Sequence, residues 1–166
     1  MTGVDRCDEC GFEYGTVDAG AIPDRLGTFA GLYAAALAAV PDVRRRPAPQ
    51  VWSPLEYACH LRDVLDVQRE RLELALRVDA PEFAPMGRDE LVVTRAYNTQ
   101  EPSAVLADLA ANAERLAAAF GALDAAALAR VGSYPWPEPV ERTLLWLGRH
   151  TVHEGEHHLM DITRMA

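Results

Sequence analysis

The chain has 166 residues, of which 49% are hydrophobic and 25% charged, and its formal net charge is −9 at pH 7. This composition predicts one globular domain with a core of its own and excludes an intrinsically disordered chain. The acidic balance argues against a nucleic-acid partner or an anionic membrane surface, and without a long apolar run or a basic leader we expect a cytoplasmic protein with no membrane span and no secretory signal.

The first predicted helix covers residues 20–40, where apolar side chains recur at helical spacing. It ends before Pro41, which opens a proline-containing linker over 41–50. Three adjacent arginines at 44–46 suit either phosphate binding or a solvated linker. The acidic character of the whole chain favours the linker.

The second helix has the most complete start signal. Ser53 is a favourable N-cap, Pro54 suits the first helical position, and Glu56 completes a capping box. Trp52 and Tyr57 occupy the two positions of a hydrophobic staple. We expect a long helix from this start to about residue 78.

Two further long helices are predicted in the second half of the chain. A short helix is expected near 89–97, and the third long helix covers 102–123. Residues 132–139 contain three prolines and cannot be helical. The fourth long helix follows over 140–165, and no strand-length alternation stands out.

Four long helices joined by two sizeable connections predict an all-α fold, a four-helix bundle with a long crossover. This domain would cover residues 20–166. Residues 1–19 precede it as an extension that contains a C-x-x-C sequence.

Five histidines carry the functional signal: His60, His150, His153, His157 and His158. The pair His153 and His157 lies one helical turn apart, which presents two imidazoles on one face for a single transition metal. These residues also match the H-E-x-x-H pattern of zinc proteases. However, Asp161, the best downstream ligand, lies about 12 Å along the helix from His153, so the protease interpretation fails.

The third ligand must therefore come from another helix, where His60 is the only histidine. We predict a metal site of His60, His153 and His157 with open positions for water or substrate. His150 is the rival ligand. Zinc, nickel, iron and copper all suit imidazole, and the sequence does not choose among them.

The residues around this predicted site receive supporting roles. His150, Glu154 and His158 are the candidates for acid or base catalysis or for the pocket rim. Ligating imidazoles normally donate their second N–H to an acceptor. The carboxylates at suitable helical spacing are Glu56, Asp63 and Asp161.

The segments 52–60 and 153–161 resemble, in order and separation, two motifs of the DinB-like (YfiT-like) superfamily of bacterial metal proteins. The resemblance spans roughly residues 20–163. It implies a four-helix bundle of up-down-down-up topology, often as a homodimer. By matching position it also implies that His60, His153 and His157 are the metal ligands.

The resemblance implies an activity as well. The family includes thiol transferases that use bacillithiol or mycothiol, and the mycothiol-dependent maleylpyruvate isomerase. We therefore expect an enzyme acting on a small molecule, with a divalent transition metal (zinc or nickel first) and mycothiol or another small thiol as cosubstrate. The alternatives are a metal-dependent hydrolase and a non-catalytic stress protein that binds a metal or small molecule.

The extension before the first helix carries Cys7 and Cys10, which look like half of a zinc knuckle. Three interpretations stay open: a pair without a role, a redox dithiol, and a second metal site. Cys59, a carboxylate or another subunit would complete such a site. The odd number of cysteines, three, favours a reducing compartment over a disulfide framework.

Overall fold

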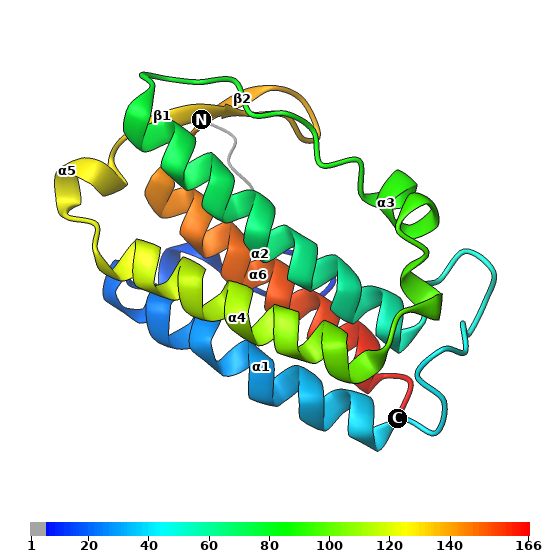
Figure 1. Cartoon of the computed structure of the whole chain (residues 1–166). Helices are drawn as coiled ribbons and strands as arrows, with labels where there is room; N and C mark the ends of the chain where they lie inside the picture. Colours follow the sequence, from blue (N-terminus) through cyan, green and yellow to red (C-terminus); the bar gives the residue numbers. More distant parts are fainter. Residues whose placement is uncertain (1–5) are drawn as a thin grey trace.

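The computed structural model describes residues 6–166 as a four-helix bundle, which confirms the predicted fold class. The four long helices are α1 (Ile22–Ala39), α2 (Pro54–Arg77), α4 (Pro102–Gly121) and α6 (Leu144–Thr163). Figure 1 shows α1 and α6 running in one direction and α2 and α4 in the other, which is the expected up-down-down-up order. Both α1 and α2 pack against α4 and α6, so α1 and α2 lie diagonally across the bundle.

Shorter elements precede α1 or lie in the connections between the long helices. They are α3 (Arg88–Thr94), α5 (Ala125–Leu128), and the 3-10 turns η1 (Tyr14–Thr16), η2 (Ala19–Ala21) and η3 (Tyr97–Thr99). Every helix in the described part of the chain is too short or too polar to cross a lipid bilayer.

A β-hairpin stands where the sequence predicted no strand. The antiparallel strands β1 (Val131–Tyr134) and β2 (Val140–Thr143) flank the proline-rich loop. The expected start of the fourth helix at residue 140 was therefore wrong by four residues. The helix begins after Thr143, whose hydroxyl accepts a hydrogen bond from the Trp146 amide at 3.1 Å and caps α6.

The start of α2 is built as the sequence predicted. Ser53 Oγ accepts from the Glu56 amide at 3.2 Å, and the Glu56 carboxylate accepts from the Ser53 amide at 2.8 Å. The Trp52 and Tyr57 rings lie 5.4 Å apart between centroids. Capping and staple together fix where the chain enters this helix, and His60 follows in its second turn.

Two of the three linker arginines, Arg44 and Arg46, contact protein groups. Arg46 pairs with the Glu56 carboxylate, Nε to Oε2 at 2.8 Å, and Arg44 donates to the backbone oxygens of Asn98 and Gln100 at 2.7 and 2.9 Å. These contacts tie the linker to the start of α2 and to η3, so Arg44 and Arg46 bind protein groups, whereas the sequence favoured a solvated linker.

Close packing fixes the position of α6 against α1. A Cβ on Gly155 would collide with the ring of Phe29. In addition, the Tyr33 hydroxyl donates to the Gly155 carbonyl at 2.8 Å. These contacts set the rotation of α6 about its axis, and with it the direction in which each of its histidines points.

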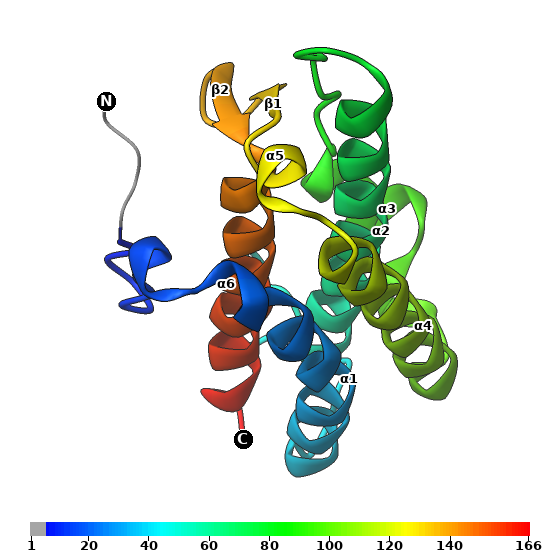
Figure 2. The same cartoon turned by 90° about the vertical axis from the view of Figure 1, so that its left-hand side faces the viewer.

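Residues 6–17 lie along α6, outside the four-helix core (Figure 2). Phe12, Tyr14 and Val17 of this segment are buried. Arg149 on α6 donates to the Val17 carbonyl at 2.9 Å. The N-terminal extension is therefore part of the packed structure from residue 6 onward.

Candidate metal centre

Three side chains from two antiparallel helices converge between α2 and α6. Glu154 Oε2 lies 3.8 Å from Nε2 of His60 and 3.6 Å from Nε2 of His158. The two imidazole rings are 5.0 Å apart between centroids. One donor atom from each of the three residues lies within 4.8 Å of the others, which places them within reach of one cation.

The His60 imidazole is buried without a hydrogen-bond partner. Its side chain is 2% exposed, and neither ring nitrogen has a partner among the described residues. Burial lowers the pKa of His60, which keeps the ring in the neutral form that binds metals. A buried polar group without a partner lowers the stability of the fold. A cation bound to Nε2 would give that nitrogen of His60 the partner that it lacks. The donor set therefore fits a divalent transition metal.

His158 is oriented by a carboxylate behind it. Its Nδ1 lies 3.1 Å from Asp161 Oδ2, so its Nε2 faces Glu154. Burial opposes the charged ring, but Asp161 and Glu154 outweigh it and raise the pKa of His158 to about 9. A carboxylate that fixes the ring of a metal-binding histidine is a common arrangement.

Of the three carboxylates proposed as partners of ligating histidines, Asp161 alone takes that role. It follows His157 by four residues, a spacing that indicates His157 as its partner, whereas its closer contact is to His158. Glu56 is engaged by Arg46 and the helix cap, and Asp63 accepts from the side chain of Arg62 at 2.8 Å.

The ligand set predicted from the sequence is divided between two clusters. No group of three or more donors within 4.8 Å among the described residues combines His60 with His153 or His157. His153 and His157 instead group with Cys7 and Cys10. One step along a helix turns the side chain by about 100°, so the pair 154/158 faces α2 while the pair 153/157 faces the N-terminal segment. The three-histidine set stays a prediction, and the geometry favours His60, Glu154 and His158.

Glu154 stands between the two clusters. Its second oxygen, Oε1, lies 3.8 Å from both His150 Nε2 and His153 Nδ1. Burial opposes its ionisation, but His158 and His60 outweigh this and hold the pKa of Glu154 well below its ordinary value. The residue is a carboxylate anion surrounded by four imidazoles.

His150 lies in an aromatic cage on the far side of Glu154. Its ring stacks on Trp146 with centroids 4.6 Å apart, and its Nδ1 lies 2.8 Å from the Tyr14 hydroxyl. Burial lowers the pKa of His150. The structure thus places this candidate catalytic residue beside the carboxylate and not in the group formed with His60.

Two aromatic residues at the start of α2, one before the helix and one in its first turn, cover the His60 group. The Trp52 ring lies 5.0 Å from the His60 ring, and the Tyr57 ring lies 5.2 Å from that of His158. Burial is the main cause that raises the pKa of Tyr57 to about 12. Its hydroxyl therefore stays protonated near neutral pH and is a hydrogen-bond donor.

Comparison with known proteins agrees with this architecture. A family model described as the DinB superfamily matches residues 26–162. The chain belongs to the DinB superfamily. A solved structure of YfiT from Bacillus subtilis superposes on this chain with a TM-score of 0.77 at 20% sequence identity. The superposition covers 88% of this chain and 86% of the YfiT chain. YfiT is described as a probable metal-dependent hydrolase with an unusual four-helix bundle topology. A search of the curated proteins found no match.

Within this DinB bundle, sequence reasoning understated Glu154 and His158. They share the one-turn spacing of His153 and His157, so the sequence offered two equivalent pairs on adjacent helix faces. The prediction preferred histidine over glutamate as a ligand. Which pair lies beside His60 depends instead on which face of α6 contacts α2. That face depends on packing contacts such as Gly155 on Phe29.

Proposed function

We propose that the protein is a metal-dependent enzyme acting on small molecules, with one divalent transition cation held by His60, Glu154 and His158. The convergence of these donors beside the unpartnered nitrogens of His60 carries the proposal. Three protein ligands leave further coordination positions open, which is typical of catalytic rather than structural sites.

When bound, such a cation polarises a substrate oxygen and lowers the pKa of water or of a thiol. The chain's own residues prepare the site for it. Asp161 accepts from His158 and holds the ring with Nε2 inward, while the Glu154 carboxylate offsets part of the cation's charge. Trp52 and Tyr57 shield the His60 group from bulk water, and the Tyr57 hydroxyl is available to donate to a substrate oxygen.

Hydrolysis is the reaction that this ligand set favours. Two histidines and one glutamate bind zinc in hydrolytic enzymes such as thermolysin and carboxypeptidase A. YfiT, which shares the fold, is described as a probable metal-dependent hydrolase. We therefore infer attack of water on an electrophilic carbonyl or related centre.

Thiol transfer or isomerisation with a mycothiol-type cosubstrate is the second candidate. A hydrolase needs a base to accept a proton from water. Here Glu154 lies inside the donor group, and Asp161 is engaged by His158. A thiolate is already deprotonated when it attacks, so it suits a site whose carboxylates are committed.

Turnover assays with and without thiol separate these reactions. The zinc- or nickel-loaded protein would be given ester and amide substrates and, separately, an electrophile with mycothiol. Hydrolysis predicts turnover without thiol, and thiol transfer predicts turnover only with it. In either case His158→Ala should abolish turnover, whereas the adjacent His157→Ala should retain it. A metal-loaded protein inactive in both assays would contradict the catalytic proposal and leave the non-catalytic binding function.

A further inference from the structure

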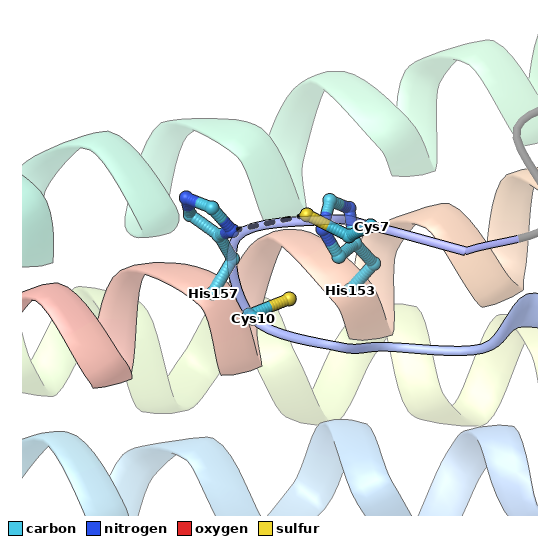
Figure 3. Close-up of side chains that lie close together, drawn as sticks. All are labelled: Cys7, Cys10, His153 and His157. Atoms are coloured by element: carbon cyan, nitrogen blue, oxygen red, sulfur yellow. Dashed lines mark hydrogen bonds between the residues drawn. The ribbon is translucent and has the colours of Figure 1, made fainter.

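A second group of metal-binding side chains lies on the other face of α6. Cys7 and Cys10 of the N-terminal segment meet His153 and His157, which come from successive turns of the helix (Figure 3). One donor atom from each of the four residues lies within 4.8 Å of the others. The Cys7 Sγ lies 3.7 Å from His157 Nδ1.

These separations suit a tetrahedral ion. With Zn–S bonds of about 2.3 Å and Zn–N bonds of about 2.0–2.1 Å, tetrahedral angles place neighbouring ligand atoms roughly 3.3–3.8 Å apart. The contact between Cys7 and His157 falls in this range. All donor atoms of the group lie within 4.8 Å of one another.

The backbone of the N-terminal segment is shaped as a tight turn around the two cysteines. The Cys7 amide donates to the Phe12 carbonyl and the Gly11 amide to the Cys7 carbonyl, both at 2.8 Å. Gly11 has φ +74°, which a residue with a side chain rarely adopts. This turn aims both sulfur atoms at α6.

Each histidine of the group is oriented by a second partner. The Tyr14 hydroxyl lies 3.1 Å from Nδ1 of His153, and Nε2 of that ring is buried without a partner in the described structure. Glu9 Oε2 lies 3.3 Å from Nε2 of His157, so Nδ1 of His157 faces Cys7. One nitrogen of each ring is thus occupied and the other is left for an ion.

We propose that Cys7, Cys10, His153 and His157 form a second, structural zinc site that fastens the N-terminal segment to α6. The C-x2-C and H-x3-H spacings and the S2N2 donor set are those of tetrahedral zinc sites. Four protein ligands close the coordination sphere, so this site holds structure and does not bind substrate. Zinc binding replaces the two thiol protons, which pass to solvent.

This assignment resolves the open interpretations of the C-x-x-C pair. The site is completed from within the chain by two histidines. Cys59 is buried and its Sγ lies 3.7 Å from the Tyr97 carbonyl oxygen, in contact with η3 and not with the N-terminal segment. The site is also distinct from the His60 group, with which it shares no ligand.

Cobalt substitution of the full, untagged chain tests the proposal. Thiolate ligation gives a sulfur-to-cobalt charge-transfer band, which we expect in the wild type, at lower intensity in Cys7→Ser or Cys10→Ser, and not in the Cys7→Ser, Cys10→Ser double variant. Cys59→Ser and His158→Ala should retain the wild-type band. Absence of the band from the wild type, its persistence in the double variant, or its loss in His158→Ala would overturn the proposal.

Zinc content provides a second readout that separates the two centres. The wild type should hold about two zinc ions per chain, and His157→Ala and His158→Ala about one each. If His158→Ala loses none while His157→Ala loses one, the structural site stands and the catalytic centre fails.

Modification of Cys7 and Cys10 in the wild type by a thiol reagent should release one zinc ion to a chromophoric chelator. No release on complete modification would contradict thiolate ligation without relying on the folding of any variant.

Discussion

The imidazole rings of His157 and His158 lie at 89° to each other with centroids 5.3 Å apart, although the residues are neighbours in sequence. His157 joins the group of Cys7 and Cys10, and His158 joins that of His60. Adjacent positions on one helix therefore contribute to two different candidate metal centres. Substitutions at these two positions form a matched pair, because they change the same residue type at almost the same place in the fold.

The Asp161→Asn variant tests how His158 is oriented. The amide keeps the shape of the carboxylate but loses its charge and its strength as an acceptor for Nδ1–H. We expect affinity at the His60 centre to fall about 10–100-fold with the fold intact. Competition with a chromophoric chelator measures this, and Asp108→Asn on the exposed face of α4 is the control. Equal affinities of the two variants would contradict the role of Asp161.

The Gly155→Ala variant tests the close approach of α6 to α1. The added methyl would collide with the ring of Phe29, so we expect a loss of about 1–3 kcal/mol in the free energy of unfolding. Gly31→Ala is the control, because a Cβ there meets open space and alanine favours a helix by about 0.5–1 kcal/mol over glycine. Urea unfolding measures both. A smaller side chain at Phe29 should restore part of the stability lost at Gly155.

The ion pair of Glu56 with Arg46 predicts an acid-sensitive part of the stability. Burial opposes ionisation of Glu56, but hydrogen bonds from Arg46 and Ser53 outweigh it and hold the pKa of the carboxyl below its ordinary value. The contribution of the ionised Glu56 to the free energy of unfolding is therefore fully present above the pKa of the unfolded state, about 4.3. It is lost as the pH falls through the lower pKa of the folded state. We expect Glu56→Gln to cost about 1–3 kcal/mol at pH 7.

Urea unfolding at pH 7 and in the acid range measures this dependence, and the cost of Glu56→Gln should shrink as the pH falls. Glu73→Gln is the control, since its partner Arg69 and the carboxylate are both partly exposed. Its cost should be less than about 1 kcal/mol. A cost for Glu56→Gln that does not change with pH would show that the charge of the carboxylate is not what stabilises the start of α2.

Chelation should act on the two centres differently. Both proposed ions would bind the folded chain and not the unfolded one, so their removal should lower the midpoint of thermal unfolding. At the proposed structural site, removal should also increase amide hydrogen exchange in the turn of residues 7–12. A Cys7→Ser, Cys10→Ser double variant should show that higher exchange before chelation and no further change after it. Exchange in the turn that is equal with and without zinc would count against the fastening role.

Local signals in the sequence were sufficient to predict where α2 begins. Ser53, Pro54 and Glu56 act within one turn of chain, so a single segment contains the whole interaction. The hairpin has no such signal, because its strands have four residues each and its position depends on contacts such as Phe83 with Ser133, fifty residues away in the chain. The same distinction explains why the fourth helix was predicted to begin too early.

In the candidate site, too, one part could be predicted from the sequence and another part depends on packing. That His60 would lie beside residues of the last helix followed from the scarcity of histidine elsewhere in the chain. Which of those residues lie beside it did not follow, because His153 and Glu154 differ by one helical step and the packing of α6 determines which of them faces α2. The partners of Cys7 and Cys10 lie more than a hundred residues further on, and no local pattern connects them.

The one-residue offset between the two ligand pairs has an evolutionary consequence. Inserting a single residue upstream in α6 would rotate the following turns by about 100° and turn the pair His153 and His157 toward His60. The same event would turn Glu154 away from His60, to the position that Gly155 now holds against Phe29. Members of this superfamily could therefore exchange an all-imidazole centre for a carboxylate-containing one through a length change in one helix, with no new ligand having to arise.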